Sequence, residues 1–455
     1  MTADFVARLS AAQMEIWLAQ ALMPESAIYN VGETLQLPAS LDVEAFKAAL
    51  NIAVSETDAL HVRFSRTDRG PLQHTGISPR WRILEDPEPA KVGTDLDRRL
   101  QRELETPIDL EGDALFRTTL FRLDVGGFVW CQLFHHIVMD GFGRHLFMRR
   151  VAELYNQIAG GLPLSDRAFG AFDDLLADDR AYHESDEAHR DRGLWRRELS
   201  GFKGTASRTA AGGSMAGFRR QAVRLSPEDT KALHDFSAVS GVGIASILSA
   251  AAAAVSARTA ASDETVVGFV ASARTKAARS IPGAISNVLP LRLSLDLRES
   301  WRDLLGRVRE RVQFALDHQR TRLEDMRRDL GPSGDGAELT PVVVNVIPFF
   351  EPLQFGGEAA TPRNLSNGPV DDFSVVAYPH RSEDCLRIDF NAHAGRRDDE
   401  DLTTFRKRFL RFLSGIVSDA DASIGSVDLL FGDERSLVLD RWNATAAPVP
   451  PVTPA

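Results

Sequence analysis

Cysteine, long apolar runs and excess positive charge are all scarce in this sequence. The 455 residues include 2 cysteines, Cys131 and Cys385, which are too few for a disulfide framework and are typical of a reducing compartment. The longest apolar stretch lies around 244–255 and is shorter than the roughly 20 residues that span a bilayer. The N-terminus lacks the basic and apolar segments of a secretory signal. A net charge of −11 argues against a nucleic-acid partner, which needs clustered Lys and Arg. These absences predict a cytoplasmic protein with neither nucleic-acid nor membrane partners.

What the sequence does contain is length and an ordinary globular composition. Hydrophobic residues make up 44% and charged residues 26% of the chain, which is enough to build several buried cores. Residues 162–213 are polar, charged and interrupted, so we place the boundary between two lobes within 169–213. The pattern predicts an N-terminal lobe over 1–175, a C-terminal lobe over 176–440 and a Pro/Ala-rich linker over 441–455.

Helix and strand patterns follow one another in both predicted lobes, which indicates an α+β protein. Alternating or β-rich runs predict strands at 31–37, 115–123, 128–135, 264–271, 287–295, 342–349 and 386–393. Apolar residues at helical spacing predict helices at 9–23, 41–54, 143–158, 229–239, 244–258, 301–318 and 401–418.

The segment F-H-H-I-V-M-D-G-F-G, residues 134–143, is the strongest candidate for chemistry. A predicted strand ends in His135 and His136, and imidazole is the side chain best suited to proton exchange near neutral pH. Asp140 could orient a ring or hold the loop, and Gly141 has no Cβ to obstruct a substrate. Two other interpretations stay open from these residues alone: a structural pair of histidines with Asp140 as a turn former, and a metal site. For a metal site the sequence shows no third ligand at helical spacing.

Together with other motifs in the sequence, this segment resembles the condensation-domain family of non-ribosomal peptide synthetases. The hallmark motif of that family, HHxxxDG, corresponds to residues 135–141. Further motifs occur in the family's order along nearly the whole chain, at Leu9–Trp17, Ser55–Phe64, Ile285–Arg292, His318–Glu324 and Trp442–Thr445. Two of them are degraded. His61 stands where the second motif usually has its inner arginine, and the segment at 318–324 lacks the usual proline and aromatic residue.

The resemblance implies two chloramphenicol-acetyltransferase-like lobes arranged as a V, with an active-site tunnel between them. Carrier proteins would deliver thioesters on phosphopantetheine arms from opposite ends, and the acceptor amine would attack the donor carbonyl. The domain itself would need no cofactor and no metal. The resemblance also implies a monomer, because the fold closes its own active site within one chain.

Site roles carry over to the matching residues as expectations. His136 would lie beside the amine, either as a general base or as a group that orients the amine and stabilises the tetrahedral intermediate. His135 would support the site. Asp140 would hold the loop rather than transfer a proton, and the strand arginine Arg292 is its candidate partner. Gly141 and Asn287 would line the tunnel.

Several details resemble chain-initiating, or starter, members that add an acyl or aryl group. They are the stretches Thr57–Leu60, Ser286–Pro290, Asn345–Pro348, Phe355–Gly357 and Ser366–Asp372. A start at Met1 implies that the donor arrives from outside, as an acyl-CoA or on a separate carrier protein. The motif at 442–445 resembles the joint to a following adenylation domain. We therefore expect N-acylation of a carrier-bound aminoacyl group. Arg144 is either a solvated surface arginine or a residue that projects towards the donor channel, where it limits the length of the acyl chain or contacts a polar group of the donor.

Three other functions remain to be weighed. The chain could be an elongating, peptide-bond-forming condensation domain, or a stand-alone CoA-dependent acyltransferase acting on a free metabolite. A non-enzymatic docking platform is the third, although His135, His136, Asp140 and Gly141 are all intact.

Overall fold

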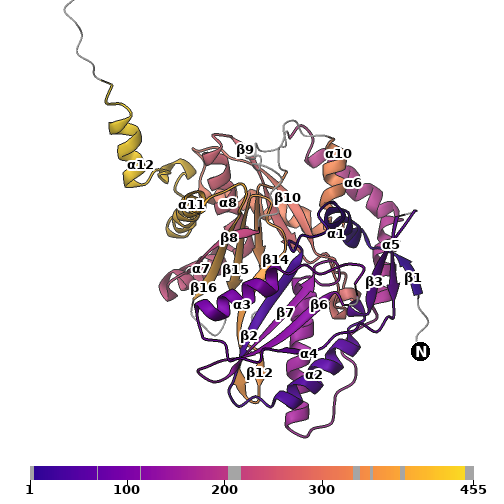
Figure 1. The fold of residues 1–455 in the computed structure, drawn as a ribbon. Coiled ribbons are helices and arrows are strands. Elements are labelled where there is room, and N and C mark those ends of the chain that lie inside the picture. The colour runs from indigo at the N-terminus through magenta and orange to yellow at the C-terminus, as the bar shows by residue number, and fades with distance from the viewer. Residues whose placement is uncertain are drawn as a thin grey trace, which may run out of the picture.

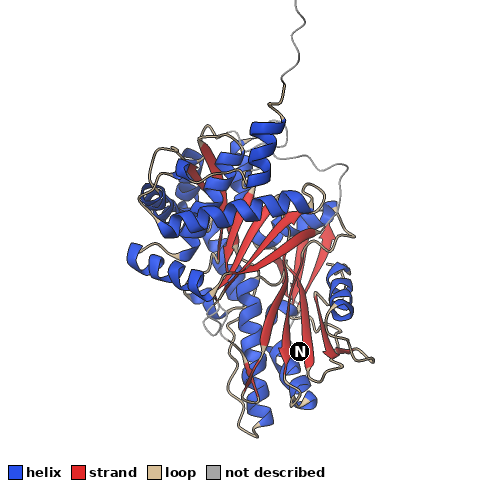
Figure 2. Ribbon diagram, turned by 90° about the vertical axis from the view of Figure 1, so that its left-hand side faces the viewer, coloured by secondary structure: helices blue, strands red, loops and turns tan. Residues whose placement is uncertain are grey.

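Two large sheets organise the protein, as its computed structural model shows (Figures 1 and 2). The structure describes residues 5–68, 70–112, 114–202, 217–331, 339–348, 352–379 and 385–445. Most of the predicted linker, 446–455, and residues 203–213 of the predicted boundary stretch lie outside these ranges, as does residue 349 at the end of the strand predicted for 342–349.

The first sheet contains the strand that ends in the two histidines. Its five strands lie in the order β14-β2-β7-β6-β5. Helices α2 and α4 cover one face and α3 lies on the other (Figure 1). These elements are β2 (Asn30–Leu37), β5 (Leu84–Glu85), β6 (Phe116–Arg122), β7 (Phe128–His135), β14 (Thr361–Asn367), α2 (Val43–Glu56), α3 (Thr94–Glu105) and α4 (Gly141–Ala159).

A smaller antiparallel sheet and the first helix adjoin this lobe. Strands β1 (Phe5–Arg8), β3 (Val62–Thr67) and β4 (Gly70–Thr75) pair in the order β1-β4-β3. Helix α1 (Ala11–Leu22) follows β1 and begins with a capping box. The Ser10 hydroxyl accepts from the Gln13 amide while the Gln13 side chain accepts from the Ser10 amide.

The second sheet has six strands in the order β10-β9-β11-β15-β16-β8, and its helix-covered face forms the most extensive core. The Ala-rich run that stands out in the sequence forms α8, where Ala250–Ala254 are completely buried. Small side chains allow α8 to pack closely on the sheet and on its neighbouring helices. The elements are β8 (Phe218–Arg224), β9 (Glu264–Ala271), β10 (Asn287–Ser294), β11 (Val342–Val346), β15 (Phe373–Pro379), β16 (Leu386–His393), α7 (Pro227–Ser240), α8 (Ile244–Thr259), α9 (Trp301–Asp317) and α11 (Asp399–Ser418).

The chain returns from the second lobe to complete the first sheet. Strand β14 pairs antiparallel with β2, with Asn367 opposite Val31. It is also tied to the second sheet, because Arg220 of β8 donates to the Asn364 carbonyl at 2.8 Å. A division at residue 175 therefore does not describe the first lobe completely. The polar composition of β14 carries no strand signal of its own, since its pairing with β2 is what makes it a strand.

Two helices occupy the stretch that the sequence presents as polar and interrupted. Helix α5 (Phe172–His183) and helix α6 (Asp186–Glu198) lie within 162–213. Their buried residues include Leu175, Leu176 and Trp195, which are few among many charged side chains. Helix α10 (Leu323–Leu330) packs against α6.

The remaining elements are short. Strands β12 (Gln354–Phe355) and β13 (Glu358–Ala359) form a hairpin beside α4, and α12 (Gly432–Ser436) lies near the end of the described chain (Figure 1). No single described helix has the length and apolarity needed to cross a membrane, although the bent pair α7 and α8 passes that test jointly.

Candidate active site

The loop that links β7 to α4 is held by backbone contacts on both sides. The amide of His135 donates to the Leu115 carbonyl at 2.8 Å, and the amide of His136 donates to the Tyr29 carbonyl at 2.8 Å. Helix α4 begins at Gly141, with Asp140 as its N-cap. This strand, loop and helix follow the sequence prediction, and they place two imidazoles and a carboxylate at the end of the first sheet.

His135 is a buried, neutral ring whose tautomer is set by its partners. The Ile137 amide donates to its Nδ1 at 3.2 Å, so Nε2 carries the proton and donates to the Gln20 side-chain oxygen at 3.3 Å. The amide nitrogen of Gln20 in turn donates to carbonyls of the 23–26 turn. Burial, with a smaller effect of His136, lowers the pKa of His135 to about 3. His135 therefore braces the loop against α1.

His136 has the opposite tautomer and is partly exposed. Its Nδ1 lies 3.1 Å from the Met139 carbonyl, which can only accept, so Nδ1 carries the proton and Nε2 keeps its lone pair. Burial lowers the pKa of His136, against the opposing effect of the Asp140 carboxylate. The ring is therefore neutral near pH 7, with one nitrogen able to accept a proton or a hydrogen bond.

Gly368, which follows β14, passes directly over the His136 ring. Its φ is +99°, and a Cβ built there would lie 2.9 Å from Cδ2 of His136. Only glycine combines this backbone conformation with this approach. The strand contributed by the second half of the chain thus helps to enclose the histidine of the first half.

Asp140 joins the two lobes at this point. One oxygen accepts from the Gly143 amide at 2.8 Å, and the other accepts from Arg274 at 2.7 Å and from the amides of Ile285 and Ser286, both at 3.1 Å. Burial on its own raises the pKa of Asp140, but the charge of Arg274 and these hydrogen bonds outweigh burial and hold that pKa below its ordinary value. Asp140 is thus a fixed carboxylate, as expected of a residue that holds the loop.

The expected partner of Asp140, Arg292, is wrong. Arg292 pairs with Glu264 at 2.6 Å and donates to the carbonyls of Glu198 and Ser200. It lies five positions along β10 from Asn287, about 17 Å at the rise of a strand, and so away from the site. Arg274 follows the end of β9 nearest the loop.

Two glycines and Asn287 occupy different surroundings near the loop. Gly143 must be glycine, because a Cβ there would lie 2.8 Å from the Gly283 nitrogen, whereas a Cβ on Gly141 would meet nothing within 4 Å. The buried Asn287 side chain donates to the carbonyls of Gln319 and Thr321 at 2.9 and 2.7 Å, which fixes that turn. The tunnel-lining roles of Gly141 and Asn287 stay predictions.

Arg144 is not a solvated arginine. It is 2% exposed, and its guanidinium lies 3.1 Å from the Glu33 carboxylate of β2. Arg144 stands in the first turn of α4, on the side that faces the sheet. The solvated interpretation is therefore wrong, whereas a role of Arg144 in limiting acyl length or contacting a polar group of the donor stays a prediction.

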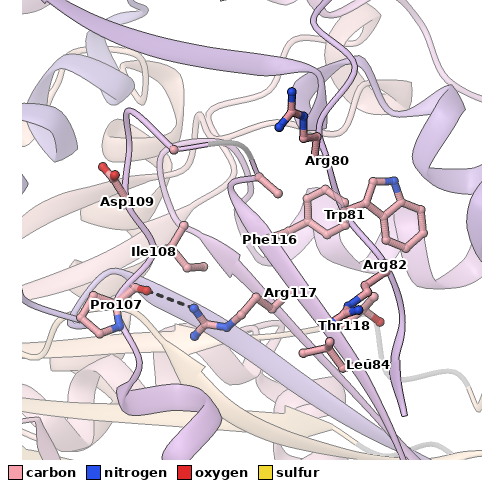
Figure 3. A pocket seen from close by; sticks show the side chains of 12 residues that line it. Arg80, Trp81, Arg82, Leu84, Pro107, Ile108, Asp109, Phe116, Arg117 and Thr118 are labelled. Carbon is pink, nitrogen blue, oxygen red and sulfur yellow. Dashed lines mark hydrogen bonds between the residues drawn. The ribbon is translucent and has the colours of Figure 1, made fainter.

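A separate cavity of about 510 Å³ lies at the edge of the first sheet, beside the start of β6 (Figure 3). Arginine side chains and the rings of Trp81 and Phe116 line it, and Arg117 donates to the Pro107 carbonyl at 3.1 Å. Its lining includes no histidine. In the described part of the chain, no group of three or more His, Cys, Asp or Glu residues is placed to hold a metal ion. The loop at 135–141 is therefore the candidate active site.

Residues 4–439 match the family model of the condensation domain. The chain belongs to this family. Two curated relatives are each 31% identical. One is a dimodular nonribosomal peptide synthase of Bacillus subtilis, matched over 98% of this chain and 19% of the relative, and the other is an isonitrile lipopeptide synthase of Streptomyces coeruleorubidus, over 92% and 29%. The chain thus spans only a fifth to a third of these curated relatives.

Solved condensation domains share the whole architecture. The starter condensation domain of rhizomide synthetase, in a variant complexed with C8-CoA, is 31% identical with a TM-score of 0.85 and covers 93% of this chain and 98% of its own. The first condensation domain of the calcium-dependent antibiotic synthetase also has 31% identity and a TM-score of 0.85, covering 94% and 100%. The predicted α+β fold of two chloramphenicol-acetyltransferase-like lobes is confirmed, as is the enzyme class, an amide-bond-forming acyltransferase.

Proposed function

We propose that this condensation domain catalyses the chain-initiating N-acylation of a non-ribosomal peptide. A thioester-activated acyl or aryl donor would be joined to the amine of an aminoacyl group held on a carrier protein. The observation that carries this proposal is the neutral His136 with its available Nε2, in a fold whose solved relatives include starter condensation domains. One of those relatives was captured with both C8-CoA and Leu-SNAC, an acyl donor and an aminoacyl thioester mimic.

The residues of the loop account for the reaction. The acceptor nitrogen attacks the donor carbonyl, the new C–N bond forms as the C–S bond breaks, and the amine proton leaves with the thiol. Nε2 of His136 accepts a hydrogen bond from the N–H of the attacking amine. This bond orients the lone pair of the amine nitrogen towards the donor carbonyl. The Met139 carbonyl holds the ring in the tautomer that this requires. Asp140 stays ionised and keeps both lobes in register around the loop.

The donor is an acyl-CoA or an acyl or aryl group on a carrier protein, and phosphopantetheine enters only as the arm of these partners. The acceptor arrives on an aminoacyl carrier protein. The motif at 442–445 supports a following adenylation domain in the same polypeptide. The scarcity of cysteine supports a cytoplasmic location, and the family fold, which closes its active site within one chain, supports a monomeric domain.

Arg144 limits the donor acyl group in this proposal. In the rhizomide synthetase complex with C8-CoA and Leu-SNAC, a histidine and an arginine eight residues apart are both replaced by alanine. His136 and Arg144 have the same spacing. The guanidinium of Arg144 occupies the space between the start of α4 and the sheet, beyond the reactive loop.

We expect Arg144→Ala to widen the range of accepted acyl chains towards longer ones, because the variant vacates that space. The measurement is the distribution of products from an equimolar mixture of acyl-CoA donors of increasing length. Removal of Arg144 leaves Glu33 buried without its partner, so the double variant Arg144→Ala/Glu33→Gln is compared as well. An unchanged length distribution in both variants would contradict a role for Arg144 in donor selection.

Intact-mass spectrometry of an aminoacyl carrier protein tests the proposed function. The carrier is incubated with this domain and a panel of acyl-CoA, acyl-carrier and aryl-carrier donors, with the His136→Ala variant as control. We expect a mass gain equal to the acyl group, which is lost in the variant. Transfer only from an aminoacyl-carrier donor would instead identify an elongating domain. Acylation of free small molecules but no tethered amine would identify a stand-alone acyltransferase, and binding of carriers without turnover a docking platform.

A further inference from the structure

Gln132 has a buried amide side chain without a hydrogen-bond partner. It is 1% exposed, and neither its amide nitrogen nor its amide oxygen has a hydrogen-bond partner. On β7 it stands between Trp130 and Phe134, whose rings both contact Phe147 of α4. Because side chains alternate along a strand, Gln132 points into the same layer between the sheet and α4. Native proteins rarely leave a buried amide unbonded, so a missing partner is expected here.

Two charged side chains share this layer with Gln132. Glu33 of β2 is directly opposite Gln132 in the antiparallel pair, which places the two side chains on the same face as neighbours. Arg144 of α4 closes over Glu33 at 3.1 Å, and its own Nε is buried without a partner. An amide, a carboxylate and a guanidinium thus lie close together inside a largely apolar layer, with donors and acceptors left over.

This group lies in line with the reactive loop. Gln132 precedes His136 by four residues on the same strand and its extension, about 13 Å at the rise of a strand. Arg144, in the first turn of the helix that begins at Gly141, joins this group through its ion pair with Glu33. A medium-length acyl chain that starts at the carbonyl beside His136 and extends as far as Arg144 would place its far end against the group that Arg144 forms with Glu33 and Gln132.

We propose that Gln132 and Glu33, with Arg144, form a polar end to the donor site and select an acyl donor that carries a hydroxyl group near its far end. This inference rests on the proposed function. A hydroxyl both donates and accepts, so it matches the free oxygen and the free nitrogen of the amide. An unsubstituted alkyl end would leave the amide without a hydrogen bond. Sites built from buried polar groups reject such analogues, so we expect the unsubstituted donor to react more slowly.

The test compares a length series of terminally hydroxylated acyl-CoA donors, each paired with the unsubstituted chain of the same length. At the optimal length we expect the wild-type domain to favour the hydroxylated donor about tenfold in kcat/KM, the effect of one net hydrogen bond. Gln132→Met keeps the shape of the side chain but removes both bonding groups, so its ratio should fall to about one. Because the wild-type amide has no partner to lose, this replacement is compatible with folding.

Cys131→Ala is the matched control, since Cys131 is the preceding residue of β7 and packs on the opposite face with Leu133. It should keep the wild-type ratio. A wild-type domain that transfers both chains equally at every length, or a Gln132→Met variant that keeps the preference, overturns the polar end but leaves the proposed function standing. A wild-type domain that transfers neither chain to the tethered amine overturns the polar end, and the proposed function falls with it only if the acyl-carrier and aryl-carrier donors are not transferred either.

Discussion

The His136→Ala variant is expected to lose about 10²- to 10⁴-fold in the rate of acyl transfer, the range that a positioned acid–base group typically contributes. Nε2 of His136 is the ring nitrogen of the loop that keeps its lone pair, because Nε2 of His135 is committed to Gln20. Stability should change little, since the His136 ring is partly exposed and its side chain is bonded to the Met139 carbonyl of its own loop. Single-turnover rates from intact-mass spectrometry, with denaturant unfolding alongside, give both quantities.

A second substitution separates proton transfer from orientation. The side-chain oxygen of His136→Gln can accept a hydrogen bond from the amine but is too weak a base to take its proton. Recovery of most of the rate in this variant would assign His136 an orienting role, and a loss as large as in His136→Ala would assign it the base. A rate that is unchanged in His136→Ala would contradict any role for the ring.

Imidazole NMR provides an independent check of the same residue. Because burial lowers the pKa of His136, the neutral Nδ1–H form should persist at pH 6.5 and be lost only as the pH falls through the lowered value. A midpoint at or above 6.5, or a proton on Nε2, would be incompatible with the geometry of the loop.

Much of the fold was predictable because its signals are local. Strand, loop and helix around the two histidines follow from a β-rich run, a turn and a helical repeat within 30 residues of sequence, and the structure confirms them as β7 and α4. Helix α9 matches its apolar repeat almost to the residue, since Ser300 and Asp303 form a capping box at its start. Such features need no knowledge of the distant chain.

What could not be predicted depends on contacts between distant residues. Strand β14 exists because β2 offers an open edge some 330 residues earlier, as the Thr34–Arg363 separation of 329 shows. Nothing in the sequence around Arg274 or Arg292 shows which of them pairs with Asp140. The pairing depends on where β9 ends, because Arg274 follows that end and thereby lies beside the loop. The burial of Glu33 could have been predicted locally. Glu33 lies on the same face of the strand as Val31 and Leu35, and that face is otherwise apolar.

Replacement of Arg274 by alanine is expected to destabilise the protein by about 3–5 kcal/mol, the usual cost of removing one partner of a buried ion pair. Arg274 and Asp140 are 1% and 0% exposed, so the variant leaves a carboxylate buried without its counter-charge. Arg292→Ala is the matched control. The side chains of Arg292 and Glu264 are 22% and 33% exposed. Ion pairs in such exposed positions contribute at most about 1 kcal/mol to stability. Guanidinium unfolding monitored by tryptophan fluorescence at pH 7 compares the two.

The pH dependence of this loss identifies its cause. In the wild type the pKa of Asp140 is below its ordinary value, so its stabilising effect is complete above about pH 4 and is lost as the pH falls through the native value. Without Arg274, burial raises that pKa, so the variant regains stability on acidification as the carboxylate takes up a proton. The difference between wild type and variant should therefore narrow as the pH is lowered from 7. A difference that is constant with pH would mean that the stability comes instead from the bond of Arg274 to the Gly283 carbonyl and its contact with the Phe142 ring.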